Sequence, residues 1–284
     1  MKTIAVIGAG TMGNGIAHVF AQNGFQVHLI DTQELALKKA LATIDKNLDR
    51  QLVKNTITQE QKIKTLDAIT TYLSIEAGVT TANMVIEAAT ENVDIKKSIF
   101  KTMDIFSPPD CILASNTSSI SITELGNVTQ HPEKVIGMHF MNPVPVMKLV
   151  EIIESKHTLP EVTQKIVSLT QQLGKVPCVV KDFPGFISNR ILMPMINEAI
   201  IALSEGVSEV ATIDQIMKLG MAHPMGPLQL ADYIGLDVCR NILIILQEGF
   251  KNSKYAPSPL LVKMVEEGKL GVKSGAGFYT YGAV

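Results

Sequence analysis

The segment that most constrains this chain is a glycine-rich turn near its amino end, in "TIAVIGAGTMGNGIA". Gly8, Gly10 and Gly13 have the G-x-G-x-x-G spacing, after a β-branched run and before an apolar helical pattern. The first glycine allows a tight turn, the second lets backbone approach a pyrophosphate, and the third lets the helix pack closely on the strand. The N–H groups and dipole of a helix start favour phosphate there. The segment predicts a dinucleotide site that includes Thr11 and Met12.

An acidic residue closes the next predicted strand. Asp31 ends the run "QVHLID", where a carboxylate can accept hydrogen bonds from the hydroxyls of an adenosine ribose. Its charge would repel a 2′-phosphate, and no arginine follows it in "DTQELA". We therefore expect NAD as the cofactor, with NADP possible. The less favoured alternative is a glycine turn in an α/β protein that binds no nucleotide.

Strand-like runs alternate with helical patterns over the first two thirds of the chain, which favours a parallel sheet with crossover helices. Residues 34–80 differ, because they are basic and amphipathic, and we predict an arm of two long helices there. After the break "DFPGF" the pattern is helical. The predicted fold is α/β: a Rossmann-type dinucleotide-binding domain, residues 1–184, followed by an all-helical C-terminal domain, residues 185–284.

Composition excludes several classes of protein. A net charge of -2 gives no electrostatic reason to bind nucleic acid or an anionic membrane. Three widely spaced cysteines fit a reduced cytoplasmic protein and form neither a disulfide framework nor a metal site. The first residues make a poor signal peptide. The apolar stretch "ILMPMINEAIIAL" is interrupted by Pro194, Asn197 and Glu198, so we expect no membrane span.

The segment "MHFMNPVPVMKLVE" contains a candidate acid–base pair. His139 ends a predicted strand, where sheets of this kind place their ligands, and imidazole accepts protons near neutral pH. Glu151 lies on the next predicted strand, and a hairpin-like return could bring its carboxylate to the imidazole. A lone histidine is more often structural, but the upstream dinucleotide motif favours a catalytic base.

Six segments together resemble a known family: "GAGTMGNGIA", "EAATENVDIKK", "ASNTSS", "HFMNPVPVMKLVE", "KDFPGFISNR" and "HPMGPLQLADYIGLD". They are similar to the short-chain 3-hydroxyacyl-CoA dehydrogenases, above all to bacterial members that act on 3-hydroxybutyryl-CoA. The resemblance covers almost the whole chain. It departs at Gln229, where an acid is common, and at Ala222, which bears on packing or assembly.

The resemblance implies a reversible hydride transfer between NAD(H) and (S)-3-hydroxybutyryl-CoA or acetoacetyl-CoA, in a homodimer. It implies that His139 is the general base and that Glu151 orients it. Ser118 would contact the substrate oxygen and the cofactor, and Asn189 would also hydrogen-bond the substrate. From the residues alone, Ser118 reads as a turn or helix cap, and Asn189 as an ordinary residue early in a helix.

The resemblance also implies contacts with the cofactor and with coenzyme A. The expected cofactor contacts beyond the glycine loop are Glu91, Lys96, Asn142 and Lys273. Arg50 and Lys54, on the basic arm, would face the phosphates of coenzyme A, although such lysines are as often a solvated face, and Glu91 and Lys96 could be a surface pair. Two other functions stay open: a dehydrogenase of a free 3-hydroxy acid, which would not need the arm, and a nucleotide-binding protein without catalysis.

Overall fold

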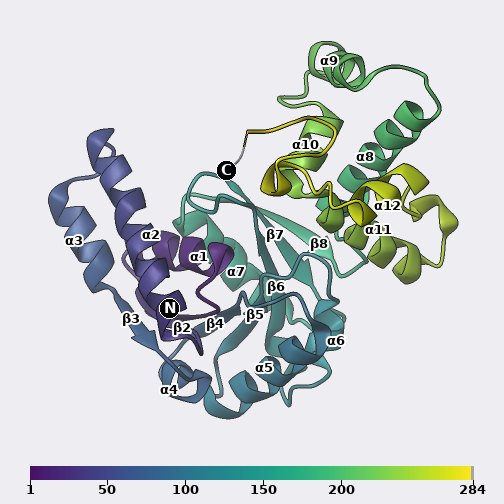
Figure 1. The fold of residues 1–284 in the computed structure, drawn as a ribbon. Helices are drawn as coiled ribbons and strands as arrows, with labels where there is room; N and C mark the ends of the chain where they lie inside the picture. The colour runs from purple at the N-terminus through teal and green to yellow at the C-terminus, as the bar shows by residue number, and fades with distance from the viewer. Residues whose placement is uncertain (283–284) are drawn as a thin grey trace. The chain divides into compact units, whose positions relative to one another are not determined.

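The structure, a computed structural model, describes residues 1–282 (Figure 1). The chain forms two compact units, the first from Met1 to Phe183 and the second from Pro184 onward. Each unit has its own buried apolar cluster. The two units are described separately below.

Unit 1 is built on one eight-stranded sheet, in the order β3-β2-β1-β4-β5-β6-β7-β8. All neighbouring strands pair in parallel except β6 and β7, which are antiparallel. The order from β3 to β6 is that of a dinucleotide-binding fold, which confirms the predicted fold class. The strands are β1 (Thr3–Ile7), β2 (Gln26–Ile30), β3 (Ile69–Tyr72), β4 (Met84–Glu87), β5 (Ile112–Ser115), β6 (Val135–Phe140), β7 (Leu149–Glu154) and β8 (Val176–Lys181).

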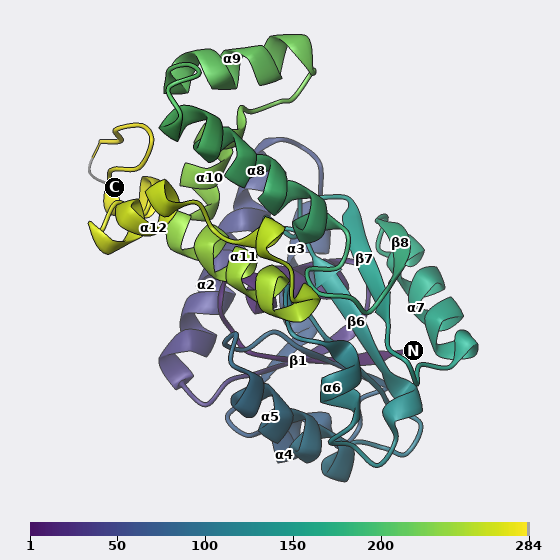
Figure 2. The same ribbon diagram turned by 90° about the vertical axis from the view of Figure 1, so that its right-hand side faces the viewer.

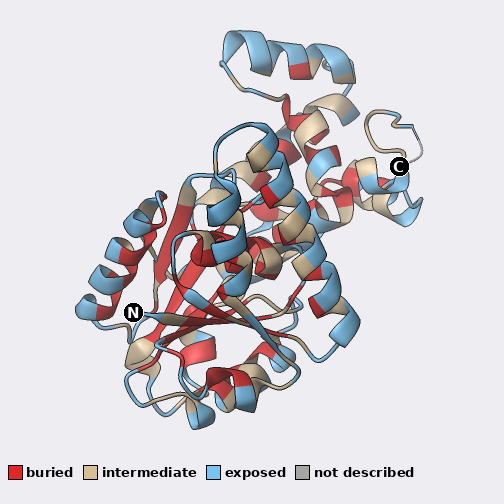
Figure 3. Ribbon diagram, turned by 90° about the vertical axis from the view of Figure 1, so that its left-hand side faces the viewer, coloured by how far each residue is buried: buried red, intermediate tan, exposed pale blue. Residues whose placement is uncertain are grey.

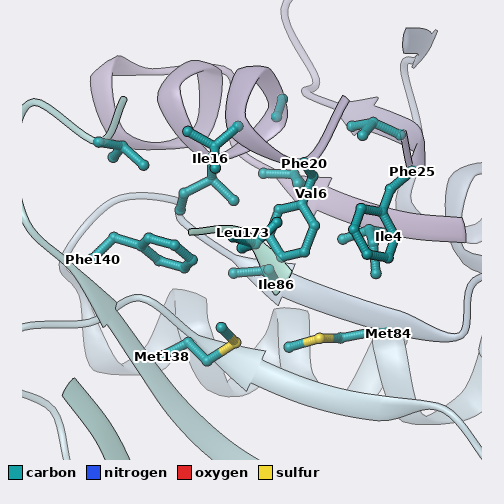
Figure 4. Packing of buried hydrophobic residues seen from close by; sticks show 14 of the residues in the cluster. Ile4, Val6, Ile16, Phe20, Phe25, Met84, Ile86, Met138, Phe140 and Leu173 are labelled. Carbon is teal, nitrogen blue, oxygen red and sulfur yellow. The ribbon is translucent and has the colours of Figure 1, made fainter. Parts of the chain in front are cut away.

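Helices cover both faces of this sheet, so its central strands β4, β5 and β6 are buried along their whole length (Figure 3). Phe20 of the first helix packs edge-on against Phe25 and Phe140, with ring centroids 5.5 and 6.4 Å away (Figure 4). The helices of unit 1 are α1 (Thr11–Gln22), α2 (Glu34–Val53), α3 (Gln59–Asp67), α4 (Ile75–Val79), α5 (Val93–Phe106), α6 (Ile122–Gly126), the 3₁₀ turn η1 (Pro132–Lys134) and α7 (Pro160–Gln172).

The predicted helical arm is only partly correct. Helices α2 and α3 lie side by side, as Figure 1 shows, and Lys62 of α3 is ion-paired with Asp45 and Asp49 of α2. The expectation of helix up to residue 80 is wrong, because Ile69–Tyr72 forms β3 and pairs with β2. The segment "ITTY" is short and half exposed, so its β-branched character was outweighed by the helical pattern before it.

Unit 2 is helical apart from two isolated β-bridges near its end (Figure 2). Residues of α8, α10, α11 and α12 form its buried apolar cluster. Within residues 1–282, no helix has the length and apolar character needed to cross a bilayer. The helices are α8 (Ser188–Ser204), α9 (Val210–Gly220), α10 (Pro227–Ile234), α11 (Leu236–Phe250), η2 (Ser253–Tyr255), α12 (Pro259–Glu266) and η3 (Val272–Ser274).

Two buried aspartates fasten the end of unit 2. The Asp232 carboxylate accepts hydrogen bonds from the backbone N–H groups of Phe278 and Tyr279 and from the hydroxyl of Tyr281. Asp214 accepts from two backbone N–H groups at the start of α10 and from the Tyr279 hydroxyl. A buried carboxylate needs such donors to offset its desolvation. Both side chains therefore help to hold residues 278–281 in place.

Candidate active site

The glycine loop has the geometry that a pyrophosphate requires. Gly8 has a φ of +98°, and a Cβ there would lie 2.6 Å from the Ala88 carbonyl oxygen. A Cβ on Gly13 would lie 1.7 Å from the Gly8 carbonyl oxygen, so this position admits only glycine. At Gly10, by contrast, an added Cβ would meet no atom within 4 Å. The loop is thus packed on its inner side and open where α1 begins, and its residues fit a dinucleotide.

Asp31 is held at the end of β2, next to the same loop. Its Oδ2 accepts a hydrogen bond from the Ala9 backbone N–H at 2.8 Å, and its Oδ1 accepts one from the Gln33 backbone N–H at 2.9 Å. These bonds fix the carboxylate beside the glycine turn. The side chain is only partly buried, so its remaining acceptor positions can bind a ribose hydroxyl.

A cavity of about 470 Å³ opens beside the glycine loop. It is lined by the start of α1, by one face of α2 and by the loop that follows β6. The α2 residues that line it are Lys39, Ala40, Thr43 and Asn47, together with Ala36. Arg50 and Lys54 are not among the lining residues; they are exposed at the end of α2, and the Arg50 guanidinium donates to the Asn47 side-chain oxygen at 3.2 Å.

The structure brings His139 and Glu151 together. They are directly opposed in the antiparallel pair of β6 and β7, on strands joined by the loop through Pro143 and Pro145. The His139 Nδ1 lies 2.9 Å from the Glu151 Oε2, and the two residues are 9% and 2% exposed. With the carboxylate ionised, Nδ1–H donates to it, which leaves the lone pair on Nε2. This arrangement can accept a proton at Nε2 and stabilise the resulting imidazolium.

Glu91 organises the turn that contains Ser118. Its Oε1 accepts hydrogen bonds from the hydroxyls of Thr117 and Ser119 and from the Ser118 backbone N–H at 3.1 Å. Burial would raise the pKa of Glu91, but the nearby Lys96 ammonium and the hydroxyl donors outweigh it, so this pKa lies below its usual value. Glu91 is therefore an anion that fixes the Ser118 turn.

Lys96 lies in the interior of unit 1. It is 1% exposed, and its Nζ lies 2.6 Å from the Glu87 Oε1 and 3.3 Å from the Glu91 Oε2. The alternative of a surface pair with Glu91 does not describe this buried network. A contact between Lys96 and the cofactor stays a prediction.

Sequence reasoning missed Glu87 and Asn116 in this region. Glu87 ends β4, is fully buried, and accepts from Lys96 and from the Ser115 hydroxyl at 2.6 Å. The side-chain oxygen of Asn116 accepts from the Phe140 backbone N–H, which ties the end of β5 to the strand of His139. An acid inside the apolar run "MVIEAA" was the available signal for Glu87.

Asn189 and Lys273 belong to unit 2. Asn189 is the second residue of α8, is 8% exposed, and donates its backbone N–H to the Gly185 carbonyl. Lys273, in η3, is ion-paired with Asp237, its Nζ 2.6 Å from the Asp237 Oδ1.

Asn142 lies just after β6 and lines the cavity of unit 1. Among residues 1–282, no cluster of three or more His, Cys, Asp or Glu side chains could hold a metal ion.

Comparison with known proteins covers both units. The model of the 3-hydroxyacyl-CoA dehydrogenase NAD binding domain matches residues 3–183, and that of the 3-hydroxyacyl-CoA dehydrogenase C-terminal domain matches residues 185–281. A probable 3-hydroxybutyryl-CoA dehydrogenase of Bacillus subtilis is 50% identical over 281 residues, which is 99% of this chain and 98% of that protein. The human mitochondrial hydroxyacyl-coenzyme A dehydrogenase is 41% identical over 288 residues, 99% of this chain and 91% of the relative.

Solved structures agree with these matches. The crystal structure of an (S)-3-hydroxybutyryl-CoA dehydrogenase from Ralstonia eutropha superposes with a TM-score of 0.97 at 46% identity, over 100% of both chains. The resemblance identified from six sequence segments is thereby confirmed. With two matching family models that together span nearly all of its residues, and relatives of 50% identity along its whole length, this chain belongs to the 3-hydroxyacyl-CoA dehydrogenase family.

Proposed function

We propose that this protein catalyses the reversible oxidation of (S)-3-hydroxybutyryl-CoA by NAD⁺ to acetoacetyl-CoA, NADH and a proton, in short-chain fatty acid metabolism. The observation that carries the proposal is the buried hydrogen bond between the His139 Nδ1 and the Glu151 Oε2, 2.9 Å long, in the unit that also contains the glycine loop. The names of the bacterial relatives and of the Ralstonia eutropha structure support this substrate.

In this mechanism the bound nicotinamide supplies the hydride acceptor. His139 takes the proton of the C3 hydroxyl on Nε2, and in the reverse direction it returns that proton to the forming alkoxide. Glu151 stabilises the imidazolium that forms when His139 takes up this proton, because its carboxylate already accepts the hydrogen bond from Nδ1–H. General-base catalysis of this kind typically contributes ~10²–10⁴-fold to the rate.

The remaining residues of the proposed site bind and orient the substrate and the cofactor. We assign the substrate oxygen to Ser118 and Asn189, and Glu91 acts on Ser118 by fixing its turn. Asp31 would bind the adenosine ribose. The glycine loop, with Thr11 and Met12, would receive the pyrophosphate, and the proposed contacts nearer the nicotinamide are Ser118, Glu91, Lys96, Asn142 and Lys273.

Coenzyme A and assembly complete the proposal. Arg50 and Lys54, exposed on the arm, would attract the phosphates of coenzyme A. Unit 2 would contribute to substrate binding and to a homodimer, because apolar side chains such as Ile191, Ile216 and Leu219 are more than half exposed. We place the enzyme in the cytoplasm, since its cysteines are free thiols.

A steady-state assay tests the function directly. Purified protein is given acetoacetyl-CoA or acetoacetate at matched concentration, each with NADH and with NADPH. We expect turnover with acetoacetyl-CoA and a preference for NADH, because Asp31 disfavours a 2′-phosphate. Equal turnover of acetoacetate would instead favour a dehydrogenase of free 3-hydroxy acids. Binding of NADH without turnover of either substrate would refute an enzymatic role.

A further inference from the structure

Unit 1 contains a second buried lysine, and its surroundings differ from those of Lys96. Lys175 precedes β8 and is 8% exposed. Its Nζ donates to the Val144 carbonyl oxygen at 2.6 Å and to the Met147 carbonyl oxygen at 2.7 Å. Among residues 1–282, no carboxylate forms a salt bridge with it. Its ammonium group is thus buried and is held by backbone oxygens.

Both of these carbonyls belong to one loop, residues 141–148, which joins the strand of His139 to the strand of Glu151. The loop also bonds to itself, since the backbone N–H groups of Val146 and Met147 both donate to the Pro143 carbonyl. Lys175 therefore anchors this loop through two backbone carbonyl groups that are three residues apart, those of Val144 and Met147.

The same loop forms one wall of the cavity at the glycine loop. Asn142, Pro143, Val144 and Pro145 line the space of about 470 Å³ together with Gly10 and other residues of the glycine loop and α1. Val144 is 2% exposed and packs on α1 so closely that a Cβ added to Gly15 would lie 2.9 Å from its own Cβ. A shift of the loop would therefore change the shape of the site where the dinucleotide is proposed to bind.

The chemistry of Lys175 favours a role beyond filling space. Burying an ammonium group without an anionic partner is costly, and burial lowers the pKa of Lys175 from its usual value. An apolar side chain of similar length would avoid that cost, but it would leave two carbonyl groups of the loop without these donors. Lys175 thus supplies two hydrogen bonds to the loop although the burial of its charge is unfavourable.

We propose that Lys175 is a positioning residue for cofactor binding: it acts through the loop of residues 141–148 and keeps the wall of the dinucleotide cavity in place. The inference rests on one part of the proposed function, the binding of NAD(H) in this cavity. It predicts that loss of the two hydrogen bonds weakens cofactor binding, whereas His139 and Glu151 stay paired because the sheet holds them.

Lys175→Met tests this, with Lys165→Met as the matched control, because Lys165 is an exposed lysine of α7. The NADH dissociation constant is measured by fluorescence titration, and the pH dependence of kcat/KM with acetoacetyl-CoA is recorded. For Lys175→Met we expect the NADH dissociation constant to rise at least about tenfold and the shape of the pH profile to stay as in the wild type. Lys165→Met should bind NADH as the wild type does.

Lys175→Arg keeps the charge and the donors, so it should bind NADH more tightly than Lys175→Met. A folded Lys175→Met variant that binds NADH within about twofold of the wild type would overturn the inference, and so would one that loses only thermal stability. If Lys175→Met does not fold, the shorter and neutral Lys175→Gln decides, with at least about fivefold weaker NADH binding expected and wild-type binding as the overturning result. A wild type that binds NADH but does not reduce acetoacetyl-CoA would refute the function and leave this comparison intact.

Discussion

His18 makes the stability of unit 1 depend on pH. It lies on α1 with no solvent exposure, and its Nδ1 has no hydrogen-bond partner within residues 1–282. Its Nε2 lies 3.5 Å from the side-chain nitrogen of Gln51 in α2. Burial lowers the pKa of His18 from 6.5 to about 4, because the imidazolium cannot be solvated there. The folded protein therefore keeps this histidine neutral.

The sign and size of the effect follow from linkage. Below about pH 6.5 the unfolded chain takes up a proton that the folded chain refuses until about pH 4. With respect to His18, the free energy of unfolding is therefore highest above about pH 6.5, and it decreases as the pH falls from about 6.5 to about 4. The full loss would be about 3.4 kcal/mol, and about 2 kcal/mol of it would be reached at pH 5.

His18→Gln removes the titrating group and introduces an amide that can hydrogen-bond to Gln51. Urea unfolding, followed by circular dichroism, gives the free energy of unfolding at about pH 7.5 and pH 5 for both proteins. We expect the wild type to lose about 2 kcal/mol more than His18→Gln between these pH values. The control is His157→Gln, an exposed histidine, which should behave as the wild type does. Equal losses in His18→Gln and the wild type would refute the reasoning.

Three further substitutions test the proposed site. His139→Ala should lower kcat at least about a hundredfold with little change in the NADH dissociation constant, and near-normal turnover would exclude this base. Glu151→Gln should lower kcat and change the pH profile of kcat/KM, since the imidazolium loses its anionic partner; an unchanged profile would contradict the pairing. Asp31→Ala should weaken the binding of NADH more than that of NADPH in parallel titrations. Equal losses of affinity for both would mean that the cofactor preference was misjudged.

The parts of the fold that could be predicted are those that local patterns determine. The glycine loop needs backbone space that only Gly8 and Gly13 provide, so their spacing predicted the dinucleotide turn and the sheet around it. The pairing of His139 with Glu151 could be anticipated because two apolar runs flank a proline turn. The strand at Ile69–Tyr72 was missed, since its formation depends more on pairing with β2 than on its own sequence.

What could not be predicted depends on contacts between distant parts of the chain. Charged residues such as Glu87 and Lys96 are usually exposed, and only their mutual pairing explains why both are buried. Lys175 reads as a surface lysine in sequence, because the loop that accepts its hydrogen bonds lies about 30 residues earlier. The burial of His18 likewise results from the packing of α2 on α1, which the helical pattern of either segment does not reveal.

The hydrogen bonds of the Asp232 carboxylate depend on residues that are synthesised much later than Asp232 itself. Its donors, at Phe278, Tyr279 and Tyr281, leave the ribosome more than forty residues after it does. Until then, a nascent unit 2 must keep this anion hydrated, which opposes its burial. These contacts of the helical unit can therefore form only after residues 278–281 have emerged, whereas the sheet of unit 1 has all of its strands much earlier.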